Sequence, residues 1–284
     1  MTLNVENKQN VLIFRAKRRG RHYLKLLRQR LTPSRETRPV FILGSGRSGT
    51  DIVSHCLSKA WDVELINEDN PTAFENWRLK SLDVVASAVD ASKASLVLFK
   101  PIVETLRANE FLAEFQSATV VYVVRNPDDA INSMARFFGE AQVRAVKSWV
   151  ETDFDRQPLA PPEIREFIAS HCHADLSVAD AAGLYWLLYN SAYLFLGLQS
   201  NARVTMIRYE DLVQKPEETM REICDFLGIK WSPSMTDEVY AGSVGKNRKP
   251  DLSPAIETEC LDVWGRLIGE QRQNNTSGSV NKSL

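Results

Sequence analysis

Residues 39–50 are the feature of this sequence that most constrains its fold. Four apolar residues, Val40 to Leu43, lead directly into the loop Gly44–Gly49, which contains three glycines, two serines and an arginine. A helix-like pattern begins at Thr50. A buried strand that ends in a glycine-rich turn before a helix brings backbone N–H groups together at the helix N-terminus, where they bind phosphate or sulfate. The segment therefore predicts an α/β protein with an anion site at the end of its first strand.

The loop lacks the two side chains with which a P-loop NTPase binds its substrate. Such a loop has Lys and then Ser or Thr after its last glycine, whereas Thr50 and Asp51 follow Gly49 here. The phosphate-binding lysine and the magnesium-binding hydroxyl are therefore missing, and the cation lies inside the loop as Arg47. This exchange argues against a nucleotide kinase and predicts an anion site that uses no metal.

Three further segments have the composition of buried parallel strands. They are residues 95–99 (SLVLF), 119–124 (TVVYVV) and 204–208 (VTMIR), which are rich in β-branched residues and show no polar alternation. Helical patterns separate them, including a helix start at Asn126-Pro127 and a long apolar helix over 179–199. The βαβ order predicts a doubly wound, three-layer fold with a parallel central sheet.

Two cations follow predicted strands at the sheet edge where open α/β proteins bind ligands. Arg125 ends one strand, and Ser133 lies in the second turn of the next helix, so both can reach one phosphate. Lys100 ends another strand and points toward the same edge.

These segments resemble those of sulfotransferases that use 3′-phosphoadenylyl sulfate (PAPS), especially the tyrosylprotein and many bacterial sulfotransferases. The similarity covers about residues 39–270 and is strongest over 39–52, with its Arg-Ser-Gly-Thr loop, and over 121–138, with Arg-Asn-Pro and a serine eight residues after the arginine. A third match is the Arg-Tyr-Glu-Asp-Leu segment that begins at Arg208. The resemblance implies a P-loop NTPase-like fold, PAPS as co-substrate, adenosine 3′,5′-bisphosphate (PAP) as product and no metal.

The resemblance also implies roles for individual residues. Arg47 and Lys100 stabilise the charge that develops during transfer, and Glu68, which stands twenty-one residues after Arg47 as in the tyrosylprotein enzymes, is the general base. The residues expected to bind the nucleotide are Ser45, Gly46, Arg47, Ser48, Gly49, Thr50, Asp51, Arg125, Ser133, Tyr209, Ser243, Lys246 and Arg248.

Two features of this expected site leave alternatives open. The family often has a second threonine where this chain has Asp51, and a carboxylate beside a phosphate loop is unfavourable unless it points away to cap the helix or pairs with Lys100 or Arg125. Rival candidates for the base are nearby acidic residues and one histidine, namely Glu64, Asp69, Glu75 and His55.

The two ends of the chain differ from its centre in charge and composition. Residues 1–38 carry eleven Lys or Arg and only two Glu, although the whole chain has a formal net charge of −1. We expect a basic helical arm over 1–38, a catalytic domain over 39–273 and a disordered Asn-, Ser- and Gly-rich tail over 274–284. The arm either packs as a solvated helix against its own acidic domain or contacts an anionic polymer or membrane.

Other features of the whole chain predict the cellular compartment of the protein. The sequence has no signal-peptide pattern and no apolar run near the ~20 residues that a membrane span needs. Its four cysteines, Cys56, Cys172, Cys224 and Cys260, show no metal-ligand spacing. We expect a cytoplasmic protein with reduced cysteines, and the near-neutral overall charge argues against nucleic acid as a partner.

The expected activity is transfer of a sulfonate group from PAPS to an acceptor hydroxyl on a glycan, glycolipid or other metabolite. The alternatives are a P-loop nucleotide kinase and a nucleotide-binding homologue that Asp51 has made inactive. Residues 139–174, with a double proline and few clean helical periods, are expected to shape the acceptor entrance.

Overall fold

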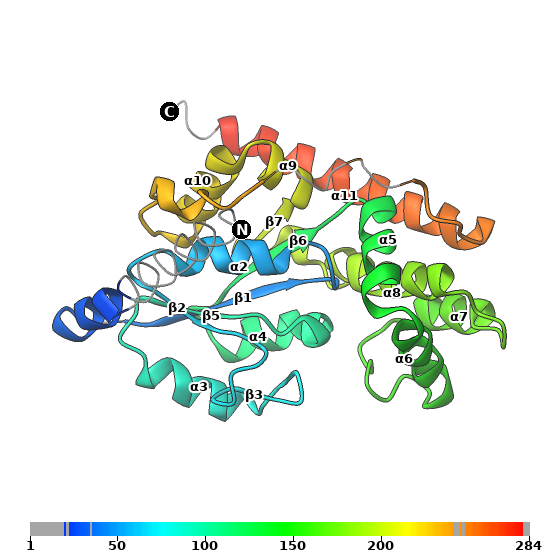
Figure 1. The fold of residues 1–284 in the computed structure, drawn as a ribbon, viewed down its shortest axis with the longest axis horizontal. Coiled ribbons are helices and arrows are strands. Elements are labelled where there is room, and N and C mark those ends of the chain that lie inside the picture. Colours follow the sequence, from blue (N-terminus) through cyan, green and yellow to red (C-terminus); the bar gives the residue numbers. More distant parts are fainter. Residues whose placement is uncertain (1–19, 21–22, 35, 241–244, 246–247, 281–284) are drawn as a thin grey trace, which may run out of the picture.

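The centre of the protein is a five-stranded parallel sheet (Figure 1). The computed structural model describes residues 20, 23–34, 36–240, 245 and 248–280. The strand order is β2-β5-β1-β6-β7. The strands are β1 (Arg38–Gly44), β2 (Val63–Ile66), β5 (Leu96–Phe99), β6 (Thr119–Val124) and β7 (Val204–Arg208). A separate antiparallel hairpin is formed by β3 (Phe74–Glu75) and β4 (Arg78–Leu79).

Helices cover both faces of the sheet, which confirms the predicted three-layer α/β fold. The α-helices are α2 (Thr50–Ser58), α3 (Leu82–Ala91), α4 (Ala108–Glu114), α5 (Pro127–Phe138), α6 (Glu140–Glu151), α7 (Pro162–His171), α8 (Val178–Phe195), α9 (Tyr209–Gln214), α10 (Pro216–Leu227) and α11 (Pro254–Val280). Three 3₁₀ segments are η1 (Ile102–Arg107), η2 (Leu198–Ser200) and η3 (Pro233–Met235). No helix within these described parts is both long and apolar enough to cross a bilayer.

Alternate residues of each central strand enter two separate cores. Val40 and Ile42 of β1 pack with α2 and α10, whereas Phe41 and Leu43 face α4 and the α8 side. All four are fully buried. A strand buried on both faces needs apolar residues at every position, which is why the sequence of β1 shows no alternation.

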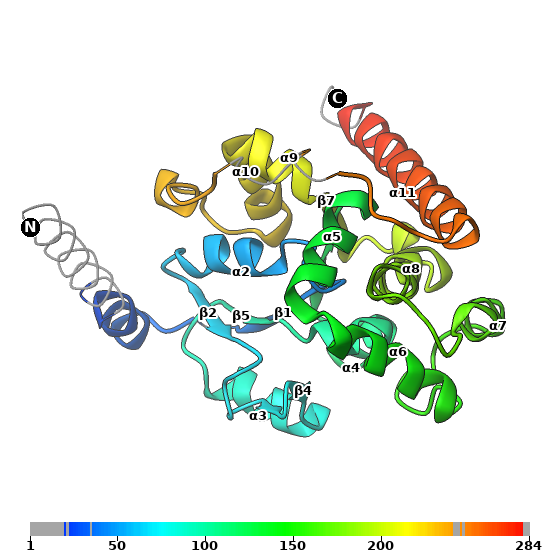
Figure 2. The same cartoon turned by 45° about the vertical axis from the view of Figure 1, so that its right-hand side comes forward.

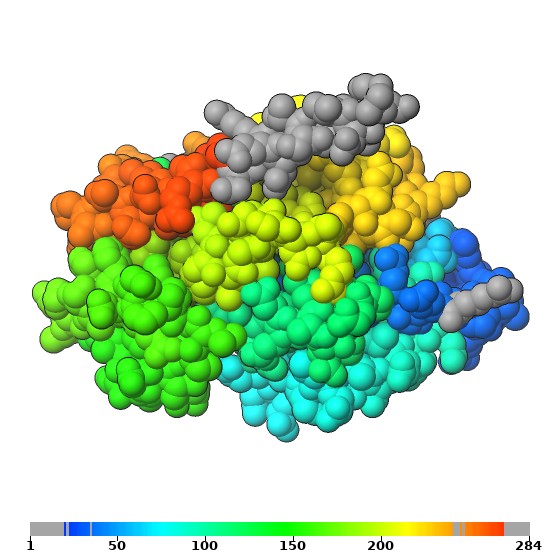
Figure 3. Space-filling model, turned by 180° about the vertical axis from the view of Figure 1, so that it is seen from behind, coloured from blue at the N-terminus to red at the C-terminus, as the bar shows by residue number. Residues whose placement is uncertain are grey.

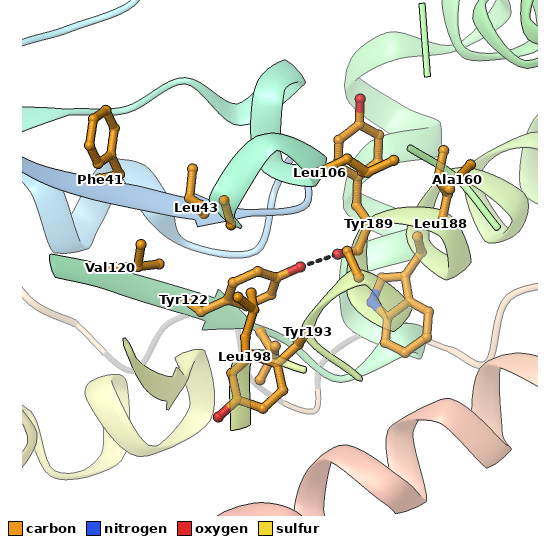
Figure 4. Close-up of a cluster of buried hydrophobic side chains, with 14 of the residues drawn as sticks. Phe41, Leu43, Leu106, Val120, Tyr122, Ala160, Leu188, Tyr189, Tyr193 and Leu198 are labelled. Carbon is orange, nitrogen blue, oxygen red and sulfur yellow. Dashed lines mark hydrogen bonds between the residues drawn. The ribbon is translucent and has the colours of Figure 1, made fainter. Parts of the chain in front are cut away.

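Helix α8 is the central element of the larger core. Tyr122 of β6 donates a hydrogen bond to the backbone carbonyl of Tyr189 in α8, and its ring lies 5.2 Å from that of Tyr193 (Figure 4). Burial raises the pKa of the Tyr122 hydroxyl well above its usual range, so this hydroxyl stays protonated as a donor. The contact ties α8 to the strand that ends at Arg125.

Two segments differ from their expected form. Residues 139–174, which show few clean helical periods in the sequence, contain the helices α6, with Val143, Val146 and Trp149 buried, and α7, with Ile168 buried. Helix α11 continues to Val280, through most of the tail for which disorder is expected. Its first turns are anchored by buried Ile256, Cys260 and Leu267, and an existing helix extends at a low cost per residue. The four cysteines are free thiols.

Candidate functional site

The glycine loop after β1 is fixed at its start by a residue from another element. Thr105 of η1 donates its hydroxyl to the carbonyl of Gly44 (2.9 Å) and accepts a hydrogen bond from the Gly44 N–H (3.1 Å). A Cβ on Gly44, whose φ is 141°, would lie 2.3 Å from the carbonyl oxygen of Val123. Glycine is therefore required here, because β1 and β6 approach too closely for any side chain.

The loop turns into α2 at a second required glycine. Gly49 has a φ of 102°, and a Cβ there would lie 2.3 Å from Cδ2 of Tyr209. Ser48 closes the turn by donating its hydroxyl to the carbonyl of Ser45 (2.7 Å). Helix α2 then begins at Thr50, which places its free N–H groups at the loop, as an anion site needs.

Arg47 and Arg125, which come from different strands, meet beside this loop. Arg125 Nη1 donates to the backbone carbonyl of Arg47 (3.2 Å), and Arg47 Nε donates to the hydroxyl of Ser133 on α5 (3.3 Å). The Arg125 guanidinium lies over the ring of Tyr209, 4.3 Å from its centre. Four residues that the sequence assigns to nucleotide binding are therefore joined in one contact network.

Lys100 connects the loop to the expected general base. Its Nζ lies 2.5 Å from Glu68 Oε2 and 2.9 Å from Asp51 Oδ1, and Lys100 is buried. The second oxygen of Glu68 accepts a hydrogen bond from the backbone N–H of Ile102 (3.3 Å). Asp51 thus pairs with Lys100, as a carboxylate at this position needs to, and its side chain is 72% exposed on the other side.

Burial controls the ionisation of this pair. Burial raises the pKa of the Glu68 carboxyl above its usual value, although Lys100 and the Ile102 N–H act in the opposite direction. Burial alone lowers the pKa of Lys100, but the carboxylates of Glu68 and Asp51 outweigh it and raise that pKa. The site therefore places a lysine whose charged form is favoured beside a carboxyl group of increased basicity.

The rival bases lie elsewhere. His55 binds Glu238 (2.7 Å), and Glu64 accepts a hydrogen bond from the hydroxyl of Ser92 (2.6 Å). Asp69 and Glu75 are exposed. Within the described residues, Glu68 is the member of this set that contacts Lys100.

The late basic loop lies partly outside the described residues, and this includes Ser243 and Lys246. Its described part lies along α5. The Gly245 N–H donates to Asp129 Oδ2 (3.0 Å), and Asn132 donates its amide to the carbonyl of Arg248 (2.7 Å). This brings Arg248 to the helix that carries Ser133.

Some residues of this site carry no local sequence signal. Thr105 reaches Gly44 from sixty-one positions away. Glu210 is buried and accepts a hydrogen bond from the Asn126 N–H (2.9 Å), so it holds the turn after Arg125. Phe137 lies under the Arg47 guanidinium at 4.5 Å, and Phe138 and Tyr185 border Gly46.

A cavity of about 580 Å³ lies along η1, the segment whose first residue, Ile102, donates its N–H to Glu68. Its walls are the β3–β4 hairpin, η1 and the segment 155–159 between α6 and α7. Tyr189 contacts two residues of its wall, because its hydroxyl accepts a hydrogen bond from Gln157 and donates one to the Val103 carbonyl, and its ring stacks on Tyr185 at 4.4 Å. The segment expected to shape the acceptor entrance therefore lines a cavity at this edge of the sheet.

The donors at this site suit a ligand with two anionic groups. The Ser45 hydroxyl is buried in the loop and has no hydrogen-bond partner among the described residues, so it is free to bind an anion. Two arginines and a lysine, with the N-terminus of α2, provide separate positions for two anionic groups. In the described residues no group of three or more His, Cys, Asp or Glu is arranged to hold a metal ion.

The fold and the loop define a nucleotide-type anion site at the carboxyl edge of a parallel sheet, on a P-loop-like scaffold. The chain belongs to the sulfotransferase family, because the family's sulfotransferase domain matches residues 37–251.

Individual relatives are distant. A 3-alpha-hydroxysteroid sulfotransferase from Cavia porcellus is 25% identical over 122 residues, which cover 43% of this chain and 35% of the relative. The chain thus matches only about a third of the length of this curated relative.

Two solved structures are similar in fold. The sulfotransferase domain of the Synechococcus PCC 7002 olefin synthase has a TM-score of 0.47 and 16% identity, covering 84% of this chain and 97% of that one. A sulfotransferase from Alicyclobacillus acidocaldarius has a TM-score of 0.46 and 18% identity, covering 84% and 94%.

Proposed function

We propose that this protein transfers a sulfonate group from PAPS to the hydroxyl of an acceptor. The observation that carries the proposal is the meeting of the two anion-binding motifs, in which Arg125 bonds the Arg47 carbonyl and Arg47 bonds Ser133. Family membership and the Lys100–Glu68 pair support the same conclusion.

Each part of the site has a distinct task in nucleotide binding. The loop 45–50 and the N-terminus of α2 hold the phosphosulfate end, and Arg125 with Ser133 holds the 3′-phosphate. Tyr209, which already contacts Gly49 and Arg125, supports this end of the nucleotide. When bound, PAPS supplies a sulfonate on a good leaving group.

Side chains of the protein then accept the proton of the acceptor and stabilise the charge on the leaving group. Glu68 accepts the proton of the acceptor hydroxyl as the acceptor oxygen bonds to sulfur. The bond from sulfur to the bridging phosphate oxygen breaks, and its electron pair remains on PAP. Arg47 and Lys100 stabilise the negative charge that develops there. Because a sulfonate carries less charge than a phosphoryl group, these two cations replace a metal, and excess chelator should leave the rate unchanged.

The cavity along η1 is the proposed acceptor site, and its chemistry favours an acceptor with an anionic group. Arg78 and Arg107 both bind Glu104 (2.9 and 3.5 Å), and Arg107 also binds Glu110 (2.7 Å), so these two guanidiniums share two carboxylates. Arg156 also lines the cavity, and the described residues offer it no ion-pair partner. Each guanidinium has five N–H donors, so the cavity retains donors for a carboxylate or sulfate, as on an anionic glycan or lipid.

The test is a transfer assay with ³⁵S-labelled PAPS over hydroxyl acceptors, in which every carboxylic acid is paired with its methyl ester. We expect transfer, with the acids preferred over the esters. ATP turnover instead of sulfonate transfer would indicate the kinase alternative. Tight PAP binding without transfer to any acceptor would indicate the inactive homologue.

The substitution Arg125→Ala is expected to weaken PAP binding by about 10- to 100-fold. A hydrogen bond to a charged group contributes about 1.5–3 kcal/mol, and 1.4 kcal/mol corresponds to tenfold in affinity. Isothermal calorimetry with PAP measures the change, and Arg107→Ala, which alters a cavity arginine, is the matched control and should bind PAP normally. Unchanged PAP affinity in Arg125→Ala would remove this residue from the nucleotide site.

A further inference from the structure

The helix over residues 23–31, here called the N-terminal helix, packs against the protein through its polar side. Lys25 Nζ donates to the Ser58 carbonyl (2.5 Å), and the amide of Gln29 donates to the Trp61 carbonyl (2.9 Å). Gln29 is only 6% exposed. Arg28 adds an ion pair with Asp62 (3.7 Å) and lies over the Trp61 ring.

The apolar side of the same helix faces outward. Leu24, Leu27 and Leu31 are 59%, 54% and 72% exposed, and Tyr23 next to them is 71% exposed. Their spacing of three and four residues places them on one helical stripe. A surface helix normally turns such a stripe toward the core, so this helix is inverted. The interpretation that it merely packs as a solvated helix on its own domain does not account for this orientation.

The charge around the stripe indicates what covers it. The first 38 residues carry eleven Lys or Arg and two Glu, and in the N-terminal helix the exposed Arg28 and Arg30 flank the leucines, whereas Lys25 binds the protein body. A bilayer with anionic headgroups can bind both the leucine stripe and the basic residues beside it. The apolar side chains enter the headgroup–acyl boundary, and the basic side chains remain at the phosphates. A second copy of this chain would instead place one basic arm against another, which is unfavourable.

We propose that the N-terminal helix is a docking surface for a bilayer that contains anionic lipids. The helix holds residues 58–62, at the end of α2 that lies away from the glycine loop, because α2 begins at Thr50 beside that loop. Figure 2 shows the N-terminal helix at the end of the body opposite α5 and α8, and Figure 3 shows the same separation from behind. A docked molecule therefore keeps its nucleotide site open to water, and vesicles should not inhibit nucleotide binding.

The test is co-sedimentation of the full chain with vesicles of phosphatidylcholine and phosphatidylglycerol in equal parts, beside vesicles of phosphatidylcholine alone. We expect binding to the mixed vesicles that weakens with added salt. The triple variant Leu24→Ser, Leu27→Ser and Leu31→Ser keeps every charge and should bind about tenfold less or weaker still. Leu261→Ser, which changes an exposed leucine on α11, is the matched control and should bind like the unaltered chain.

Three outcomes overturn the proposal. The first is a chain that does not bind the mixed vesicles, and the second is a triple variant that binds them as well as the unaltered chain does. The third is light scattering that shows a dimer which the triple variant converts to a monomer, because the stripe would then join two copies. PAP calorimetry on each variant verifies its fold and tests the nucleotide site separately from the bilayer contact.

Discussion

Replacing Glu68 by glutamine is expected to lower kcat by about 10²- to 10⁴-fold, the usual contribution of a general base. Glutamine has nearly the same shape and keeps an oxygen that can accept the Ile102 N–H, but it cannot take a proton. Lys100 keeps its partner Asp51, so the fold and the nucleotide site should be preserved. Steady-state kinetics with labelled PAPS measures the loss, and PAP calorimetry should show little change.

The pH dependence tests the same assignment independently. Burial raises the pKa of Glu68, so its carboxylate becomes protonated, and the rate falls, at a pH above the ~4.3 of an ordinary glutamate. The raised pKa of Lys100 keeps the lysine charged well into the alkaline range. Glu64→Gln, in the neighbouring strand β2, is the matched control and should retain both the rate and the acid limb. A full rate in Glu68→Gln would assign the proton transfer to another group.

The sequence was sufficient for four of the five strands of the sheet, all but β2, and for the two anion motifs, because both depend on short-range patterns. Strands buried on both faces produce unbroken apolar runs, and three of the expected strands match β5, β6 and β7 to within one residue. The glycine requirements at Gly44 and Gly49 follow from contacts with Val123 and Tyr209, yet they are visible as a local glycine pattern.

The parts that the sequence did not predict depend on contacts between distant segments. Thr105 and Glu210 look like ordinary helix residues, and only the packing of η1 and α9 places them against Gly44 and Asn126. The pairing of Asp51 with Lys100 was one of three options that the residues left open, beside a helix cap and a pair with Arg125. The inverted orientation of the N-terminal helix could not be predicted either, because an amphipathic pattern does not determine which side of the helix packs against the protein.

Removing the guanidinium of Arg47 is expected to lower kcat by about 10²- to 10³-fold, as the loss of one preorganised donor to a developing charge typically does. Arg47 has a φ of 63°, so a substitution also changes the backbone preference of the loop. The pair Arg47→Ala and Arg47→Gly separates the two effects, since glycine adopts this φ without strain and alanine does not. If the side chain stabilises the charge, both variants lose the rate to a similar extent in labelled-sulfate assays. If Arg47 serves only to shape the loop, Arg47→Gly keeps most of the rate, and its role belongs to the turn rather than to the transfer.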